Sequence, residues 1–534
     1  MKTTIKNLIL SAVLVVGGAS CVDLDTAPYD RGTDLTYWEE DPEAAVKALN
    51  TCYTYLGNMD EQLYCEAMTD NAYTKQPNDA TQNIGNGSYS TADPYVKKVW
   101  DGRYTGIRMC NELLENIDRV PDLDPELKKR YIGEAKVLRA YNYYELYTKF
   151  GDVPYTTKVL SIKESMSIAR TAKATVIANV LADLDEVING NYLPTSYDAD
   201  NKGRITRWAA MAIKAKIYLF EGNWTQVKNI TSTIMTEGGF KLFGSYAGLF
   251  EIANEYNSEV ILDAQYRPTS REHQMMYVFL PPTLGGYSQL SPLQELVDSY
   301  IMLDGKTIKE TGTSFDESHP YANRDPRLKA TVMYTGNSYT LADGTEVVIN
   351  CEKGEGKDGY GVGSDCSATG YYIKKYWDNT YRATLYSGLN PILIRYADIL
   401  LMNAEALAEL GELDKTAWDA TIKPIRDRAG FTLASALEFP EGASKDKLIE
   451  IVRNERRSEL ALEGHRHKDI IRWRIADNVL NGWCHGLKTN DVVGTDDGYV
   501  RVENRTFNAN KHYLWPIPQA ERDLNGNLEQ NPNW

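Results

Sequence analysis

Apolar positions recur with helical spacing in the segment GRITRWAAMAIKAKIYLFEGNW (203–224). Larger or apolar side chains follow one another at three- and four-residue intervals, which places them on one face of a helix. The pattern predicts a helix that ends near Gly222, because glycine readily adopts the left-handed conformation of a C-terminal cap. A second helix, roughly Trp224 to Met235, is predicted after a two-residue turn.

Two more segments carry a similar pattern. In RYADILLMNAEALAELGELDKTAWDATI (395–422) a small residue, Ala404, lies seven residues before Gly411, as in the first unit. VLRAYNYYELYTKFGD (137–152) predicts a third unit together with the helix before it or after it. Paired helices of this kind bury their apolar faces only by stacking on neighbouring pairs. We therefore predict a scaffold of helical hairpins of the tetratricopeptide type.

The chain between the hairpins has a different character. Residues 236–390 are rich in Gly, Tyr, Asn and Asp, with short strand-like runs such as Val347 to Asn350. We predict a mainly α fold, a tetratricopeptide-like helical hairpin scaffold with large loop-rich insertions and minor β structure. Composition favours one domain, 41–534. Its scaffold helices are expected mainly in 41–235 and 392–475, and its loop-rich parts in 236–391 and 476–534.

The N-terminus has the layout of an export signal. Lys2 and Lys6 precede an apolar run (8–16), and the small residues 17–20 follow. The run is about half of the roughly 20 apolar residues that a membrane-spanning helix needs. Residues 1–20 are therefore predicted to be a signal peptide that is removed.

A cysteine directly follows the predicted signal. Its position resembles the lipobox of bacterial lipoproteins, whose cysteine becomes the lipidated N-terminus. Cys21 is thus the predicted lipidation site, and 21–40 the lipidated N-terminus and tether. The alternative is an unremarkable cysteine after a soluble export signal. Since no second apolar stretch in the sequence approaches membrane length, anchoring by lipid is the consistent mode.

Charge and cysteine usage narrow the classes of partner and cofactor. Removal of residues 1–20 takes away two lysines and moves the formal charge from −16 to −18. Such a surface repels phosphate backbones, which argues against nucleic acid as a partner. Cys351 and Cys366 bracket a Gly-rich loop, where a disulfide and two buried thiols are equally expected. No cofactor or metal is predicted; a structural Ca²⁺ is compatible with the sequence but not indicated by it.

Catalytic motifs are missing from the sequence. There is no GxSxG and no HExxH, and the one GxGxxG, at Gly354, Gly356 and Gly359, opens no helical pattern and is interpreted as a turn. His465 and His467 stand two residues apart and would point to different faces of a helix, which disfavours a zinc pair. We predict that the chain is not an enzyme. A glycosidase pair of carboxylates stays as an unsupported alternative.

The charged run ERRSELALEGHR (455–466) is interpreted as structural. Its acids and arginines have helical spacing that allows i,i+3 and i,i+4 ion pairs. The same interpretation applies to Arg426 and Arg428. The tail aromatics Tyr513 and Trp515 are interpreted as packing residues.

Several segments together resemble one family. They are VLRAYNYYELYTKFGDVPY (137–155), GRITRWAAMAIKAKIYL (203–219), NRDPRL (323–328), IRYADILLMNAEAL (394–407), IRDRAGF (425–431), ERRSELALEGHRHKDIIRW (455–473) and HYLWPIPQAERDLNGNLEQNPNW (512–534). They look like the SusD/RagB family of outer-membrane lipoproteins of Bacteroidetes. His467, Lys468 and Asn533 are minor departures from its pattern. The resemblance implies a SusD-like fold, a tetratricopeptide-like half with loop-rich elaborations, and no catalysis.

The resemblance also implies a function. Members of the family capture an oligosaccharide, or in some cases a peptide, at the cell surface and sit as a lid on a TonB-dependent transporter barrel. We expect a lipid-anchored, outward-facing glycan-binding protein of the outer membrane that delivers oligosaccharide or polysaccharide to a SusC-like transporter. The alternatives are a peptide-capturing RagB-like lipoprotein and a structural transporter lid without its own ligand.

A glycan binder needs exposed aromatic rings surrounded by amide, carboxylate and guanidinium groups. Three polar stretches offer such groups, and the resemblance places contacts around the ends of the first. The predicted ligand-binding residues are Asp70, Asn71, Tyr73, Tyr89, Tyr95 and Trp100 in 70–100, Tyr376, Trp377, Asn379, Tyr381 and Arg382 in 371–388, and Tyr287 in LGGYSQL.

The local patterns qualify these choices. Trp100 also begins a helical stripe of core type, so that a buried position is equally expected. Strict alternation predicts a strand over 372–377, with Trp377 at the start of a polar stretch. Two glycines before Tyr287 let the backbone bend and present the ring. Tyr386 lies in the second stretch and has the same chemistry.

Overall fold

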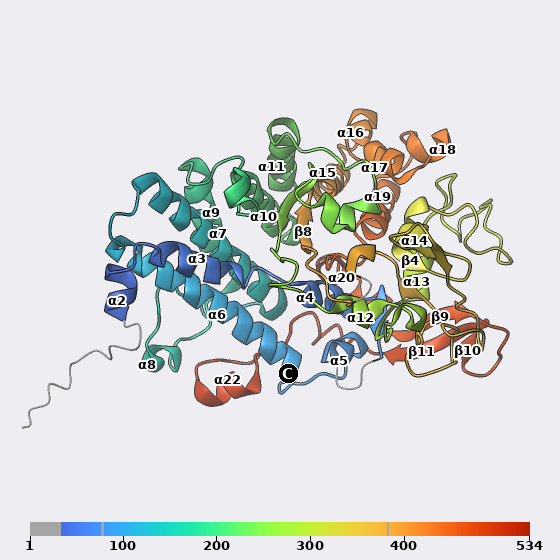
Figure 1. Ribbon diagram of the computed structural model, residues 1–534, viewed down its shortest axis with the longest axis horizontal. Coiled ribbons are helices and arrows are strands. Elements are labelled where there is room, and N and C mark those ends of the chain that lie inside the picture. Colours follow the sequence, from blue (N-terminus) through green and yellow to red (C-terminus); the bar gives the residue numbers. More distant parts are fainter. Residues whose placement is uncertain (1–33, 76–79, 382–383) are drawn as a thin grey trace, which may run out of the picture.

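The structure is a computed structural model that describes residues 34–75, 80–381 and 384–534 (Figure 1). The predicted lipidation site, Cys21, lies outside the described residues. The described part is mainly helical with small sheets, which confirms the predicted fold class. None of its helices is both long enough and apolar enough to cross a membrane.

The helices form two blocks that are separated along the chain. The first contains α2 (Asp34–Glu39), α3 (Ala44–Tyr53), α4 (Met59–Tyr64), α5 (Ala80–Asn86), α6 (Pro94–Asn116), α7 (Pro125–Phe150), α8 (Ile162–Ser165), α9 (Lys173–Asn189), α10 (Arg207–Phe220) and α11 (Trp224–Glu237). The second contains α15 (Tyr396–Leu410), α16 (Lys415–Ala420), α17 (Ile422–Ala429), α18 (Ala434–Leu437), α19 (Lys445–Glu459), α20 (Arg466–Arg472) and α21 (Ala476–Val479). The short helices α12 (Met275–Phe279), α13 (Gln294–Ser299), α14 (Pro326–Thr331) and α22 (Gln519–Leu524) belong to the loop-rich parts.

The predicted hairpins are present. Gly222, with φ +70°, separates α10 from α11, and Gly411, with φ +73°, ends α15. The third expected unit, α7, packs against both α6 before it and α9 after it. α11 packs on α15, which joins the two helical blocks although the insertion separates them in sequence. Small buried residues, Ala215 in α10 and Ala404 in α15, allow these helices to approach their neighbours closely.

The β structure of the described residues consists of five small antiparallel sheets. β1 (Ala72–Thr74) pairs with β3 (Leu290–Pro292), β2 (Val260–Asp263) with β8 (Ile392–Arg395), β4 (Val332–Met333) with β7 (Tyr372–Ile373), and β5 (Ser338–Thr340) with β6 (Glu346–Val348). β9 (Gly482–Lys488), β10 (Thr495–Asp496) and β11 (Tyr499–Arg505) form a three-stranded sheet. In Figure 1 this last sheet lies at the end of the molecule opposite α2.

The strand predicted over 372–377 is wrong. Only Tyr372 and Ile373 pair in a ladder, and the chain turns at Tyr376, whose φ is +68°. Alternation failed as a guide because Lys375 and Tyr376, on opposite predicted faces, are both buried. When residues on both predicted faces are buried, burial no longer alternates every second residue, and the prediction depends on that alternation.

Two large apolar clusters hold the fold together. One fills the helical scaffold and includes Trp100 and Tyr143, and the other fills the insertion and includes Phe279 and Tyr371. Helix α4 of the first block contributes Met59 to the cluster of the insertion. The insertion is therefore packed into the scaffold rather than attached to it by its ends.

The Gly-rich loop bracketed by two cysteines contains no disulfide. Cys351 and Cys366 are both buried free thiols, which is the second of the two predicted alternatives. The GxGxxG glycines lie in this loop, and no helix opens there, as predicted.

Candidate binding site

Three tyrosines on the surface of the insertion form an aromatic platform, defined here as Tyr277, Tyr287 and Tyr386. The rings of Tyr277 and Tyr287 are stacked, with centroids 5.9 Å apart and 15° between their planes. Tyr386 meets Tyr277 edge to face at 6.0 Å and 88°. Tyr287 is 47% exposed and Tyr386 is 38% exposed, so both rings are open to a ligand.

A tight loop after α12 brings Tyr287 over Tyr277. Gly285 has φ +87°, a conformation that glycine adopts without strain. A Cβ atom on Gly286 would lie 2.1 Å from the carbonyl oxygen of Leu280, so this position has no room for a side chain. The loop closes with the backbone N–H of Tyr287, which donates to the carbonyl of Tyr277 over 2.8 Å. The predicted role of the two glycines agrees with this geometry.

Tyr386 reaches the platform from a distant part of the chain. Its neighbour Ser387 exchanges two backbone hydrogen bonds with His273, of 2.8 and 2.9 Å. The exposed amide of Gln274 donates to the Tyr386 hydroxyl over 2.8 Å. The platform thus carries an amide group beside the rings, the combination that suits a hydroxyl-rich ligand.

The first predicted stretch approaches the platform through the β1–β3 pair. Tyr73 lies opposite Ser291, a few residues after Tyr287. Tyr73 is half-buried, and its hydroxyl accepts a hydrogen bond from Gln82 over 3.2 Å. The next residue but one, Lys75, donates from its backbone to Gln289. The start of the first predicted stretch is thus paired through its backbone with the third, while Tyr386 of the second meets the platform directly.

Asp70 and Asn71 are interior residues, contrary to the prediction. The carboxylate of Asp70 accepts two hydrogen bonds of 2.8 Å from Arg466 and pairs with Arg457 at 3.0 Å. Burial alone would raise the pKa of Asp70, but these two guanidinium groups hold it well below its usual value. Asn71 donates to Glu66 and accepts from Arg457. Their polar atoms bond to other parts of the fold, so we no longer expect them to contact a ligand.

The aromatic residues later in the first stretch are packing residues. Tyr89 is 5% exposed and lies 4.8 Å from the Trp534 ring. Trp100 is 4% exposed and packs edge to face on Phe150, so the core interpretation of its helical stripe is correct. Tyr95 is half-buried and lies 6.1 Å from Trp515. Each of these rings packs on a different aromatic side chain of the fold.

The second stretch divides in the same way. Tyr376 is 4% exposed, and its hydroxyl donates to the carbonyl of Leu462. Trp377 is half-buried, and its indole N–H donates to the carbonyl of Thr340 over 3.0 Å. Asn379 is half-buried. Arg382 and the side chain of Tyr381 lie outside the described residues.

Sequence reasoning missed Tyr277. It lies within the apolar run MMYVF, between side chains that are buried or half-buried, and no local pattern marks it as exposed. Only the return of the loop to α12 places it beneath Tyr287. A search for tyrosines within ten residues of the Gly-Gly pair would have included it.

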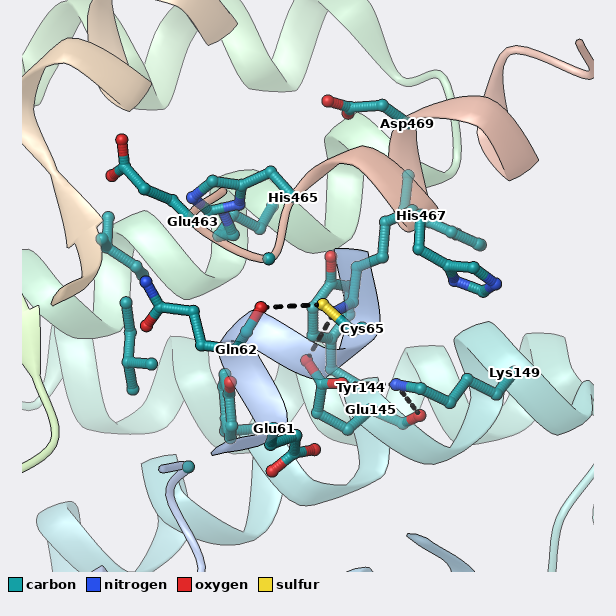
Figure 2. A pocket seen from close by; sticks show the side chains of 18 of the residues that line it. Glu61, Gln62, Cys65, Tyr144, Glu145, Lys149, Glu463, His465, His467 and Asp469 are labelled. Atoms are coloured by element: carbon teal, nitrogen blue, oxygen red, sulfur yellow. Dashed lines mark hydrogen bonds and ion pairs between the residues drawn. The ribbon is translucent and has the colours of Figure 1, made fainter. Parts of the chain in front are cut away.

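A small polar pocket, about 90 Å³ in volume, lies among α4, α7 and the start of α20 (Figure 2). Lys149 and Lys468 share the carboxylate of Glu145, at 2.6 and 2.9 Å. Burial and neighbouring lysines lower the pKa of His465 and of His467 to about 3, so both imidazoles are neutral at pH 7. Among the described residues no three His, Cys, Asp or Glu side chains form a cluster that could hold a metal ion.

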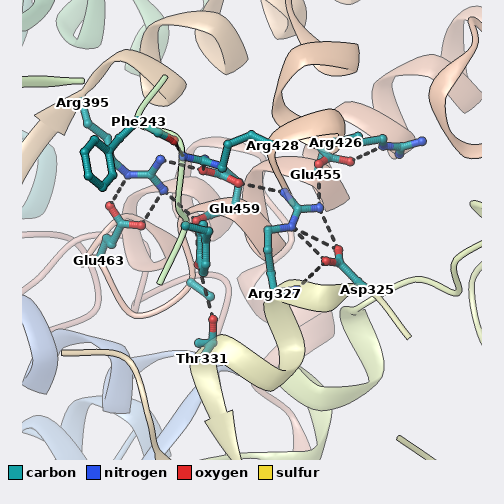
Figure 3. Close-up of polar contacts among 12 residues, drawn as sticks. Phe243, Asp325, Arg327, Thr331, Arg395, Arg426, Arg428, Glu455, Glu459 and Glu463 are labelled. Carbon is teal, nitrogen blue, oxygen red and sulfur yellow. Dashed lines mark hydrogen bonds and ion pairs between the residues drawn. The ribbon is translucent and has the colours of Figure 1, made fainter. Parts of the chain in front are cut away.

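The charged run 455–466 joins the insertion to the scaffold in a buried ionic network (Figure 3). Arg327 of α14 pairs with Glu455 at 2.7 Å and with Glu459 at 2.9 Å. Arg395, at the end of β8, pairs with Glu459 at 2.6 Å and makes two 2.7 Å hydrogen bonds to Glu463. The structural interpretation agrees with these contacts, but the expected i,i+3 and i,i+4 pairs are wrong because the partners come from distant segments.

Known proteins match the chain along almost its whole length. The SusD family profile matches residues 249–534, and a profile described as starch-binding associating with outer membrane matches 43–219. SusD-like protein P25 of Formosa agariphila is 27% identical over 514 residues, which cover 89% of this chain and 91% of the relative.

Solved structures give the same result. A SusD-like carbohydrate-binding protein from Bacteroides fragilis is 28% identical, with a TM-score of 0.81, over 92% of this chain and 100% of that one. A second SusD-like protein from Bacteroides fragilis is 27% identical, with a TM-score of 0.80, over 95% and 100%. With a family profile that covers more than half of its residues and the same fold throughout, the chain belongs to the SusD family.

Proposed function

We propose that this protein is a cell-surface glycan-binding lipoprotein whose ligand rests on the platform of Tyr277, Tyr287 and Tyr386. The observation that carries the proposal is the exposure of two platform rings, on a backbone that Gly285 and Gly286 hold in place. Chemistry by the protein itself is not part of the proposal, since SusD-family proteins are non-catalytic binding proteins.

The ligand class follows from the kind of surface. A sugar ring offers flat C–H faces to an aromatic ring and hydroxyl groups to amides and hydroxyls. Gln274 and the Tyr386 hydroxyl supply such partners beside the rings. The similar Bacteroides fragilis protein is described as carbohydrate-binding, which supports the same ligand class here.

The position in the cell is proposed from the N-terminal sequence. Removal of 1–20 and lipidation of Cys21 would anchor the protein to the outer membrane, facing the cell exterior, with 21–40 as the tether. A SusC-like TonB-dependent transporter is the proposed partner, to which the protein delivers oligosaccharide or polysaccharide. We keep 41–534 as one domain in this proposal.

Native affinity electrophoresis tests the proposal. Residues 22–534 are run through gels that contain neutral plant, microbial or host polysaccharides, and at least one of these should retard the protein. Tyr287→Ala and Tyr386→Ala should each weaken that interaction by about tenfold or more, because truncation of an aromatic hot-spot residue costs about 2 kcal/mol or more. Tyr256→Ala is the matched control, since Tyr256 is 43% exposed and lies outside the platform.

The alternatives give different outcomes. If a peptide digest but no polysaccharide raises the unfolding temperature, a peptide-capturing lipoprotein is favoured. If neither class of ligand binds, yet deletion abolishes uptake, the structural transporter lid is favoured. Unchanged glycan affinity of both tyrosine variants would remove the platform as the site.

A further inference from the structure

A second hollow of about 920 Å³ lies on the insertion, and none of the three platform tyrosines lines it. One wall is the segment 315–322, and another is the turn 334–336 that follows β4. The remaining walls come from the Gly-rich loop, at 351–355, and from β9 and β11. We call this hollow the insertion cleft. Its volume is that of a site for a small ligand or a segment of a larger one.

Aromatic rings line the insertion cleft. Tyr321 and Tyr334 are stacked, with centroids 4.0 Å apart and 18° between their planes. Tyr499, at the start of β11, contributes a third ring from another wall. All three are half-buried, which leaves part of each ring accessible. Rings from separate segments thus converge on one space, as they do on the platform.

A chain of hydrogen bonds forms the base of the cleft. The hydroxyls of Tyr321 and Tyr371 lie 3.2 Å apart, and the Tyr371 hydroxyl donates to the Gln294 side-chain oxygen over 2.6 Å. The Gln294 amide in turn donates to Asp298 over 2.7 Å. Tyr371 and Gln294 are more than nine-tenths buried, so this polar base is rigidly held. Its two half-buried ends, the Tyr321 hydroxyl and the Asp298 carboxylate, line the cleft and suit a ligand rich in hydroxyls.

The charges of the cleft select among such ligands. Its lining contains the carboxylates of Asp298, Glu317, Glu352, Glu355 and Asp491, against the cationic groups of Arg324, Lys353 and Lys488. Both lysines are paired across the rim, Lys488 with Glu317 at 2.9 Å and Lys353 with Asp491. The whole chain is also acidic, at −16. The excess of carboxylates over cationic groups repels anionic glycans such as uronate and sulfated chains, whereas neutral chains are not repelled.

We propose that the insertion cleft is a second carbohydrate-binding site, specific for neutral glycan segments and independent of the tyrosine platform. The inference goes beyond the proposed function but rests on glycan as its ligand class. A chain held at two places dissociates more slowly than a chain held at one, because the second contact is intramolecular.

Titration calorimetry with neutral hexasaccharides, namely maltohexaose, cellohexaose, laminarihexaose and mannohexaose, tests the inference. The variant Tyr287→Ala/Tyr386→Ala removes the platform and should retain binding of at least one of them. Adding Gly336→Arg should weaken that residual binding by about tenfold or more. Gly336 lines the cleft with φ +87°, so any side chain strains the turn, but no atom lies within 4 Å of a Cβ and the arginine has room to fill the cleft. Gly336→Ala in the same background carries the same strain without filling the cleft and is the matched control. Tyr334→Phe/Tyr499→Phe, which keeps the rings, should bind far better than Tyr334→Ala/Tyr499→Ala.

The outcomes separate the two proposals. Binding by the wild type that is lost completely in the platform variant overturns the cleft and leaves the proposed function intact. Residual binding that survives Gly336→Arg unchanged also overturns the cleft. Binding that depends on the cleft alone supports it and overturns the platform.

A wild type that binds none of the four sugars overturns the cleft as stated, while the polysaccharide gels still decide the proposed function. Hexagalacturonate that binds as well as the neutral sugars overturns the charge argument.

Discussion

At the scale of the residue, Arg395 shows how the interior tolerates charge. Its guanidinium is 1% exposed and bonds to Glu259, Glu459 and Glu463. Arg395→Met would leave these carboxylates with one cation fewer in a dry environment. We expect a loss of about 3–5 kcal/mol in the free energy of unfolding, measured by urea denaturation.

The control for Arg395 is a lysine on the surface. Lys415 pairs with Asp419 and Glu438 while its side chain stays 53% exposed. Lys415→Met should leave the urea midpoint close to that of the wild type, because exposed ion pairs contribute little. Equal effects of the two substitutions would contradict the view that burial of the network determines its contribution.

The low pKa of His467 leads us to expect that stability depends on pH. Burial, with Lys149 and Lys468 nearby, lowers its folded pKa to about 3, whereas an unfolded histidine titrates near 6.5. Between these values the unfolded state binds the proton, so stability falls as the pH decreases below 6.5. The slope from this one group is at most about 1.4 kcal/mol per pH unit. His467→Gln should flatten the curve below pH 6.5 and differ from the wild type by a constant above pH 7. Parallel curves down to pH 4.5 would contradict this.

At the scale of the element, the loop after α12 controls the platform. A methyl group on Gly286 would press on the carbonyl of Leu280, 2.1 Å away, and would push Tyr287 off Tyr277. Gly286→Ala should reduce glycan retardation by about tenfold or more, as truncation of the ring does, while helical circular dichroism stays unchanged. Gly102→Ala, in α6 with no atom within 4 Å, should leave binding intact. Full binding by Gly286→Ala would mean that the loop position does not set the site.

The elements also differ in how far the sequence predicts them. α10, α11 and α15 were predicted because the positions that define each helix lie within one turn or two of each other. β1 was not, because Tyr73 is paired with Ser291 and no local pattern records so distant a partner. The residues of the candidate site show the same difference between local and distant signals. Two adjacent glycines indicated an exposed ring at Tyr287. No local signal showed that Asp70 would be buried, because its partners Arg457 and Arg466 come from a distant segment.

At the scale of the whole molecule, two of the segments that resemble the family supply the contacts between insertion and scaffold. NRDPRL supplies Arg327, and the run 455–466 supplies the glutamates that it pairs with. The two segments are far apart in sequence, and the spacing within 455–466 indicates only local pairs. Their charges fasten the insertion to the scaffold. The proposed ligand site lies elsewhere, on the loops that these contacts hold in position.

The same contacts predict that scaffold and insertion unfold together. Met59 of α4 packs into the apolar cluster of the insertion, and the β2–β8 pair joins the insertion to α15. Loss of either part would expose apolar surface and leave the network of Arg327 and Arg395 unpaired. Residues 22–534 should therefore unfold in a single calorimetric transition, with far- and near-ultraviolet circular dichroism changing at the same temperature. Two resolved transitions, or a helical fragment that survives limited proteolysis after the insertion is lost, would show that the insertion is an independent unit. Coincident transitions would mean that ligand bound at the insertion stabilises the helical scaffold by the same free energy, because a ligand that binds only the folded state shifts one common equilibrium.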